Sequence, residues 1–187
     1  GYILDLNVAW DFVNWNDLTA RVVAGYKQDG WTWEDRGVYL LYPEYGYVPQ
    51  ALNGESMINY EQEFRMPYLG ASADWTWNQF TFSGYLTYSP IVAATDWDEH
   101  VARDLHFKET FDGGDMLGLG VEVRYDFAEG FFKGVFLTAA LDVQQVDLIV
   151  GDMEVENIVT GEVGGDEDVA GIENRYTVFS AGGGFRF

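Results

Sequence analysis

Four side chains with acid–base chemistry lie within five consecutive positions of the stretch ATDWDEHVA. They are Asp96, Asp98, Glu99 and His100, here called the acid–base cluster, in a chain that has only two histidines. A carboxylate beside an imidazole fixes the tautomer of the ring and favours the protonated form that results when the ring accepts a proton, which supports general-base chemistry. In an extended segment, residues two apart point to the same side, so Asp96, Asp98 and His100 would share one face. Trp97 and Glu99 would point away from it.

Other interpretations of this cluster come from the same residue types. A run of charges is most often a solvated loop at the edge of a fold. Asp96, Asp98 and Glu99 could instead hold calcium, although the glycine and distal glutamate of an EF-hand loop are missing. A zinc site is a poor match because His100 is the one local histidine and His106 is as readily a lone surface residue. The sequence also contains no G-x-S-x-G, P-loop or dinucleotide motif. No metal or cofactor is therefore predicted from the residues.

The composition limits the partners that the protein can have. It has 31 acidic and 10 basic residues, a formal charge of -21, and no cysteine. Such a polyanion repels nucleic-acid phosphates, so we expect no nucleic-acid partner and a cationic one instead. Aromatic residues make up 17% of the chain, which argues against disorder. The length predicts a single domain, residues 1–187.

Apolar side chains alternate with polar ones along most of the sequence. In residues 2–12, every even position is apolar, and Asp5, Asn7 and Asp11 fall on the other face. A period of two over this length indicates a β-strand rather than a helix. The same pattern predicts an all-β, antiparallel fold with seven strands and no helix. The predicted strands cover residues 2–12, 18–27, 61–75, 80–88, 117–127, 135–143 and 175–187.

Short and long connections follow these strands in turn. The short turns are 13–17, 76–79 and 128–130, and the long excursions are roughly 29–60, 90–115 and 145–174. Short turns at one end and long loops at the other are typical of an up-and-down transmembrane β-barrel in the bacterial outer membrane, with its long loops extracellular. A soluble β-sandwich also has alternating strands. Aromatic residues near the strand ends favour the membrane, where they form interfacial girdles: Tyr2, Trp10, Phe12, Trp75, Tyr125 and Phe127.

The final residues, GGGFRF, resemble the C-terminal recognition signal of outer-membrane proteins. That resemblance puts Phe187 at the short-turn, periplasmic end, and seven strands then put Gly1 at the opposite end. Bacterial barrels have an even number of strands, and an open sheet edge is not tolerated in lipid. We therefore expect an odd number of further strands before Gly1, or else a strand hidden in one of the long excursions.

An ordered set of motifs resembles the omptins, the ten-stranded outer-membrane endopeptidases of Gram-negative bacteria. DWDEH is followed, after a pair of strands, by AGIENRYTVFSAGGGFRF. AGYKQ, the Arg36-Gly37 pair and FRMPYLG come earlier, in the family's order and spacing. The resemblance covers the whole chain and starts at the family's fourth strand, so it implies that three strands are missing from an intact barrel of ten.

The resemblance implies specific roles for three residues of the acid–base cluster. Asp98 and His100 match the catalytic Asp–His pair, which activates a water that attacks the peptide carbonyl. Asp96 matches the carboxylate that binds the basic side chain at the cleaved bond. The family's facing pair of aspartates and a further specificity glutamate would lie in strands before Gly1, and Asp5 and Asp11 cannot replace them.

Two departures from the family concern lipid and charge. Omptins bind lipopolysaccharide, a possible activator here, through arginines on the outer face. Two of those positions are Gly30 and Glu63 in this chain, whereas Tyr26 is kept. Residues 145–174 carry nine carboxylates and no Lys or Arg. That segment is interpreted as a solvated loop or as an anionic lip that concentrates cationic peptides.

The resemblance and the composition together predict an omptin-like endopeptidase that cleaves peptides at basic residues. Its partners would be membrane lipid and a cationic peptide or protein. The alternative is a non-catalytic outer-membrane barrel with a structural, adhesive or pore-associated role. A simple pore is a weaker option, because a ten-stranded barrel filled with charged side chains leaves little conducting lumen.

Overall fold

The computed structural model describes residues 1–40 and 50–186, so the predicted terminal residue Phe187 lies outside the described part. Nearly all described residues belong to antiparallel β-strands. Within these residues the single helical turn is η2 (Val101–Arg103), and no helix there is long and apolar enough to cross a membrane. The strands are β1 (Tyr2–Trp15), β2 (Leu18–Leu40), β3 (Gln50–Trp77), β4 (Phe80–Ser89), β5 (Ala93–His100), β6 (Leu105–Asp112), β7 (Met116–Asp126), β8 (Val135–Asn157) and β9 (Val163–Phe185).

The described residues form nine strands, not the seven predicted from the sequence. Both additional strands, β5 and β6, lie within the predicted loop 90–115 and form a hairpin. The apolar row of β6 is interrupted by Glu109, and both faces of β5 carry polar residues: Asp96 and Asp98 on one side, Thr95 and Glu99 on the other. Without one apolar face, the period of two gives no signal in hydrophobicity.

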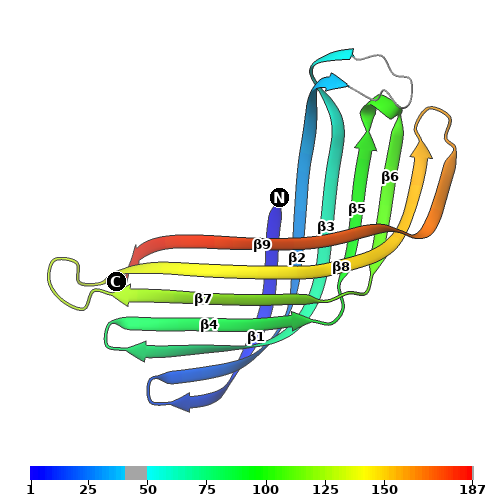
Figure 1. Cartoon of the computed structure of the whole chain (residues 1–187). Coiled ribbons are helices and arrows are strands. Elements are labelled where there is room, and N and C mark those ends of the chain that lie inside the picture. The colour runs from blue at the N-terminus through cyan, green and yellow to red at the C-terminus, as the bar shows by residue number, and fades with distance from the viewer. Residues whose placement is uncertain (41–49, 187) are drawn as a thin grey trace.

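The pairing pattern explains how nine strands fill seven positions in one sheet. Residues 69–77 of β3, its lower part in Figure 1, pair with β4, and residues 58–65, above them, pair with β5. In the same way, β8 pairs with β7 below and with β6 above. The segments β4 and β5 are thus one wall strand interrupted near Pro90, and β6 and β7 are another interrupted at Gly113 and Gly114. Among the described residues, β1 and β9 form the two edges of the sheet and do not pair with each other.

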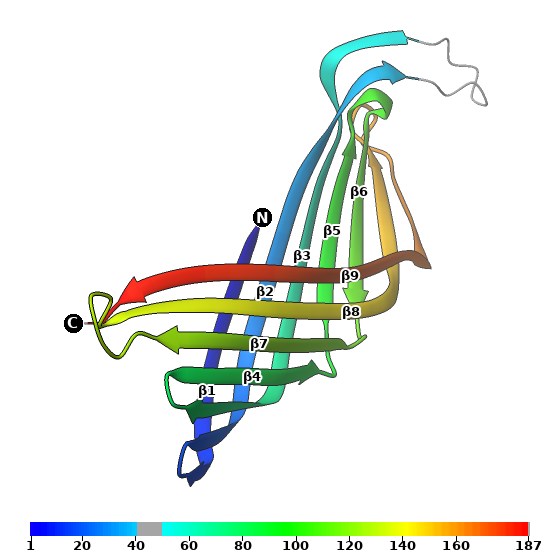
Figure 2. The same cartoon turned by 60° about the vertical axis from the view of Figure 1, so that its left-hand side comes forward.

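The remaining long excursions are also mostly strand. β2 and β3 extend the hairpin on either side of residues 41–49, which lie outside the described part. β8 and β9 pair almost to the turn at residues 158–162. The interpretation of 145–174 as a loop is therefore wrong, because all of its carboxylates except Glu162 lie on two paired strands, where they are exposed. Figures 1 and 2 show β4, β7, β8 and β9 crossing β1, β2 and β3, with the β5–β6 hairpin beyond the ends of β4 and β7.

We use "lower sheet" for β1, β4, β7 and the stretches of β2, β3, β8 and β9 beside them, next to the short turns. Its outer face is apolar. Along β7, Leu117, Leu119 and Val121 are each about half exposed, whereas the residues between them face inward. Exposed tryptophans and phenylalanines lie near the short turns, and Trp75 stacks on Phe82 with ring centroids 5.5 Å apart. An apolar band ending in an aromatic girdle is the surface that a bilayer requires of a barrel.

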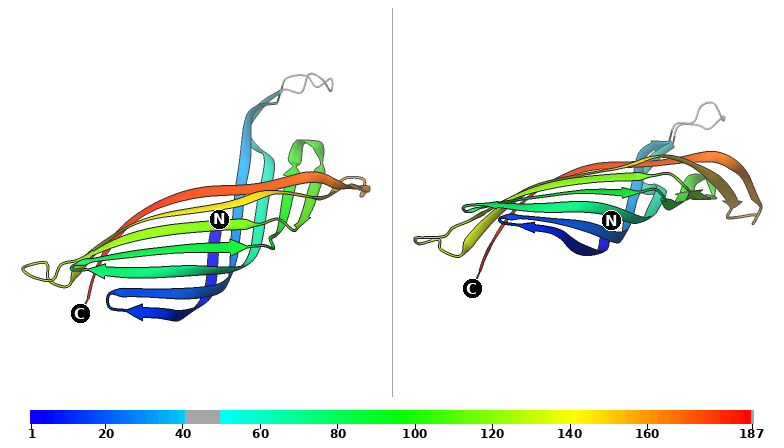
Figure 3. Two further views of the ribbon diagram at one scale, coloured as in Figure 1. Left: turned by 60° about the horizontal axis from the view of Figure 1, so that its bottom comes forward. Right: turned by 90° about the horizontal axis from the view of Figure 1, so that it is seen from below.

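The upper wall has a different outer face. We use "upper wall" for β5, β6 and the stretches that pair with them, residues 58–65 of β3 and 152–157 of β8. Its outward row runs Glu61, Trp97, Lys108 and Glu154 across the four strands. Charged side chains at this density are not stable against lipid, so the upper wall stands above the membrane. Figure 3 shows the β5–β6 hairpin and the β8–β9 turn at the end of the molecule away from the C-terminus.

The interior of the lower sheet is polar and cross-linked. Lys27 Nζ on β2 donates to Gln144 Oε1 on β8 at 2.7 Å and to Tyr176 Oη on β9 at 2.5 Å. Gln144 Nε2 also donates to the buried Asp29 at 2.8 Å. We call this set the Lys27 bridge. It joins strands more than a hundred residues apart in the sequence. Asp5, which the sequence places in the lumen, accepts from Tyr68 at 2.6 Å.

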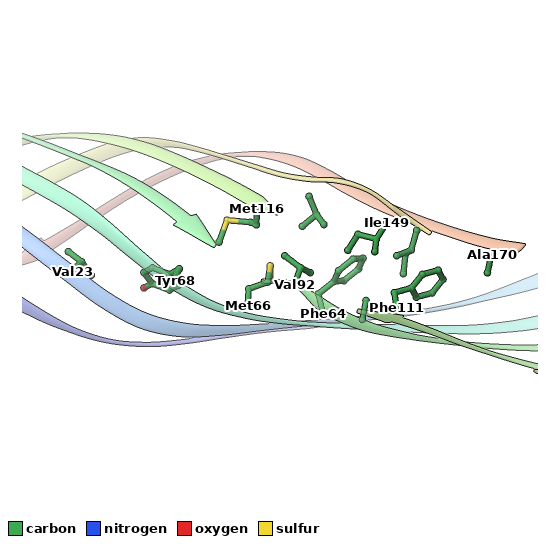
Figure 4. Close-up of a cluster of buried hydrophobic side chains, with 12 residues drawn as sticks. Val23, Phe64, Met66, Tyr68, Val92, Phe111, Met116, Ile149 and Ala170 are labelled. Atoms are coloured by element: carbon green, nitrogen blue, oxygen red, sulfur yellow. The ribbon is translucent and has the colours of Figure 1, made fainter. Parts of the chain in front are cut away.

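Above the Lys27 bridge, the interior becomes apolar. Figure 4 shows side chains from β3 meeting those from β7 and β8 between the two crossing parts of the sheet. Phe64, Phe111 and Ile149 are almost fully buried there. Ala94 and Phe111 are each two positions along their strands from residues in the row that contains Asp96. This apolar layer therefore lies directly below the row that contains Asp96, on the same face of the sheet.

The Lys27 bridge should contribute measurably to stability. Replacing Lys27 with Met keeps most of the volume but removes two charge-assisted hydrogen bonds, which should lower the free energy of unfolding by about 2–3 kcal/mol. Thermal unfolding in detergent, followed by circular dichroism, measures the change. Lys133→Met, in the exposed turn between β7 and β8, is the matched control and should change stability little. Equal effects of the two substitutions would contradict the proposed bridge.

Candidate functional site

The position of β5 between β3 and β6 determines how the acid–base cluster is presented. Its register places Tyr60 opposite Asp98 and Gln62 opposite Asp96. On the other side, β6 places Glu109 opposite Asp96. Directly paired residues share a face of the sheet, so all five side chains lie on the inner face of the upper wall. Figure 2 shows β3, β5 and β6 running side by side in this region.

Asp98 and His100 are in contact. His100 Nε2 lies 2.8 Å from Asp98 Oδ2, and both side chains are about one-fifth exposed. An ionised carboxylate only accepts hydrogen bonds, so Nε2 carries the hydrogen and Nδ1 presents its lone pair. The imidazole also packs against Phe107, with ring centroids 4.9 Å apart. The pair therefore holds an oriented proton acceptor at the partly exposed end of β5.

Asp96 is on the same face but is buried. Its side chain is only 2% exposed, and it accepts hydrogen bonds from Tyr60 Oη and, at 3.3 Å, from Gln62 Nε2. Both bonds go to Oδ2, while Oδ1 is buried with no hydrogen-bond partner in the described residues. Burial raises the pKa of Asp96 above its ordinary value, and the negative charge of Asp98 raises it further.

Glu109 lies in the same inner-face row as Gln62 and Asp96. It was not identified as a site residue from the sequence. It is partly exposed and forms no hydrogen bond or ion pair with any described residue. Burial raises the pKa of Glu109, and the charges of Asp96 and Asp98 add to this effect. A signal was available: Glu109 lies between Phe107 and Phe111 on an otherwise apolar face, which stands out once residues 105–112 are taken as a strand.

Trp97 and Glu99 lie on the outer face. Glu99 accepts from Asn59 Nδ2 at 2.8 Å and lies 3.5 Å from His106 Nε2. Lys108 stands over the Trp97 ring, 5.3 Å from its centroid. A cavity of about 740 Å³ is lined mainly by outer-face residues such as these. Asp98 and Tyr60 also border this cavity, whereas His100 does not line it.

The metal interpretations of this segment gain no support from the geometry. Within residues 1–40 and 50–186, no group of three or more His, Asp or Glu side chains is arranged to hold a metal ion. His106 lies on the opposite face from His100, so the two imidazoles cannot bind the same metal ion. The arrangement on the inner face is that of an acid–base pair beside a cluster of carboxylates.

Comparison with known proteins identifies the family. The model of the Omptin family matches residues 1–187, the whole chain. The chain belongs to the Omptin family. Its sequence is 30% identical to the plasminogen activator of Yersinia pestis over 190 residues, covering 98% of this chain and 58% of that protein. It is 27% identical to the outer membrane protease OmpP of Escherichia coli, covering 71% of this chain and 44% of OmpP.

The omptin fold is equally clear in three dimensions. The outer membrane protease OmpT from Escherichia coli superposes with a TM-score of 0.82 at 20% identity, covering 99% of this chain and 63% of OmpT. The chain therefore has the all-β fold of an outer-membrane barrel, and both the predicted fold class and the predicted outer-membrane location are confirmed. It spans about half to two-thirds of the length of the relatives that it matches.

The burial of Asp96 should make stability depend on pH. Because its pKa is higher in the folded protein than in the unfolded chain, the folded state binds more protons than the unfolded chain once pH rises above about 4. The ionised Asp96 therefore lowers the free energy of unfolding at neutral pH, and this cost disappears in acid. Asp96→Asn should gain stability relative to the parent between pH 4 and 7, as measured by denaturant unfolding across that range.

Asp112→Asn, at the exposed end of β6, controls for the lost charge in this experiment. It removes one carboxylate without removing a buried one, so its stability relative to the parent should stay nearly constant over the same pH range. A difference between Asp96→Asn and the parent that does not change with pH would contradict the burial of a charged Asp96.

Proposed function

We propose that this omptin is an outer-membrane endopeptidase and that Asp98 and His100 activate the attacking water. The observation that carries the proposal is the 2.8 Å contact between the two side chains, on the inner face of a wall that stands above the membrane. Relatives named as outer membrane proteases support the class of reaction. The chain covers only part of their length, so the activity is proposed for the full-length protein.

The proposed chemistry follows from the orientation of the imidazole. His100 Nδ1 accepts a proton from a water molecule as the water oxygen bonds to the peptide carbonyl carbon. Asp98 holds Nε2–H and stabilises the imidazolium that forms. The C–N bond then breaks, and the proton passes from the imidazolium to the departing amine. The products are a carboxylic acid and an amine, and no redox partner is required.

Specificity for basic residues is the second part of the proposal. Asp96, Asp98 and Glu109 share one face, and no Lys or Arg on the described part of the upper wall is directed to that face. The uncompensated negative charge attracts an ammonium or guanidinium group. Asp96, buried beside the pair, supplies charge for the basic side chain at the cleaved bond. A cationic peptide or protein is thus the proposed substrate.

Lipopolysaccharide is the activator that we propose to test with the peptide. Gly30 and Glu63 occupy two positions at which the family has arginines. Glu63 accepts a hydrogen bond from Tyr2 Oη at 2.9 Å and pairs with Arg65 at 2.5 Å. Tyr26 remains partly exposed nearby. The carboxylate of Glu63 pairs with Arg65 and repels a lipid phosphate, so we expect activation to be weaker than a site built from arginines alone would give.

Hydrolysis of a peptide containing Arg-Arg or Lys-Arg tests the proposed activity. Asp98→Ala and His100→Ala should each lower kcat/KM at least about a thousandfold, because either change removes the oriented proton acceptor. The measurement is the cleavage rate of a quenched fluorescent peptide by the full-length protein in detergent or lipid.

The second histidine provides a matched control for this test. His106→Ala removes an imidazole from the outer face of β6 and should leave the rate within a few-fold of the parent. Unchanged turnover in Asp98→Ala or His100→Ala would reject the assigned roles. A parent protein that cleaves no peptide would favour a non-catalytic barrel instead.

A further inference from the structure

The cation-binding carboxylates of the upper wall differ sharply in accessibility. Asp96 is 2% exposed, and Tyr60 and Gln62 occupy one of its oxygens. Its other oxygen is buried as well. A substrate side chain cannot reach either oxygen without displacing the residues around them. Asp96 thus has the charge that a basic group seeks but not the open surface that a contact needs.

Glu109 has the properties that Asp96 lacks. It sits directly opposite Asp96 on the neighbouring strand, so their Cβ atoms are about 5 Å apart. It is partly exposed and has no hydrogen-bond or ion-pair partner among the described residues. The charges of Asp96 and Asp98 act on Glu109, and the charge of Glu109 acts on Tyr60, so its carboxylate lies among these inner-face groups, as its register with Asp96 requires.

We propose that Glu109 is the carboxylate that contacts the basic side chain of the substrate, with Asp96 as a buried charge behind it. This inference rests on the proposed endopeptidase function and assigns its specificity residue. The two oxygens of one accessible carboxylate match the planar guanidinium, which presents several N–H donors in a fixed fork. The ammonium of lysine is a compact point charge that depends less on a second acceptor. The site should therefore prefer Arg to Lys.

The experiment compares three peptides that differ only at the residue preceding the cleaved bond: Arg, Lys and the uncharged citrulline. In the parent, kcat/KM should follow the order Arg, Lys, citrulline. Glu109→Gln should lower kcat/KM for the Arg peptide about tenfold or more, mainly through KM, and should reduce the Arg-to-Lys ratio toward one. Glu109→Asp, which keeps the charge, should restore part of the preference. Glu154→Gln, on the outer face of β8, loses the same charge. It should leave kcat/KM for the Arg peptide and the Arg-to-Lys ratio unchanged.

Competition with benzamidine, a small amidinium compound, gives a second readout. Its affinity, measured by calorimetry on the full-length protein, should fall about tenfold in Glu109→Gln and stay unchanged in Glu154→Gln. This binding measurement decides the inference even if the parent hydrolyses no peptide, in which case only the proposed function fails.

Two outcomes overturn the inference. If Glu109→Gln keeps the parent's Arg preference and benzamidine affinity while Asp96→Asn loses both, Asp96 is the contact residue. If Glu109→Gln is unfolded by circular dichroism, the shorter side chain of Glu109→Asp must show a weakened Arg preference, and an undiminished preference overturns the inference as well.

Discussion

The register in which β5 pairs with β3 is the constraint on which the site depends. Tyr60 stands opposite Asp98 and Asn59 opposite Glu99, so the inner face receives Asp98 while Glu99 goes outside. Because side chains alternate along a strand, a slip of one residue would turn every member of the cluster to the opposite face. The His100–Asp98 contact, the burial of Asp96 and the position of Glu109 all follow from this single alignment.

Two features of the fold below the cluster stabilise this register. Below the cluster, the apolar layer of Phe64, Ala94 and Phe111 lies on three neighbouring strands, and any slip would expose part of it. The interruption near Pro90 lets β5 continue the wall strand of β4 while the outer surface changes from apolar to charged. The wall thus carries its acid–base groups above the membrane on regular strands, which hold side chains more rigidly than a loop would.

The membrane part of this architecture is easier to predict from the sequence than the extracellular part. Residues 117–127 alternate cleanly because lipid demands apolar side chains on one face, and the structure has β7 there. Above the membrane both faces meet water, so residues 93–100 carry no apolar period and are not recognisable as a strand. The alternation of Asp96, Asp98 and His100 was nevertheless enough to place them on one face. Glu109 was overlooked because residues 105–112 were assigned to a loop, and its position opposite Asp96 comes from a pairing that local sequence does not encode.

Engineered disulfides measure the register directly, since the chain has no cysteine of its own. Asn59→Cys combined with Glu99→Cys places two thiols on directly opposed outer-face positions. Asn59→Cys combined with Asp98→Cys places them on opposite faces of the sheet. Under mild oxidation in lipid, the first pair should cross-link readily and the second should not. Efficient cross-linking of the second pair in place of the first would show that Asp98 faces outward, and the assignment of the site would be wrong.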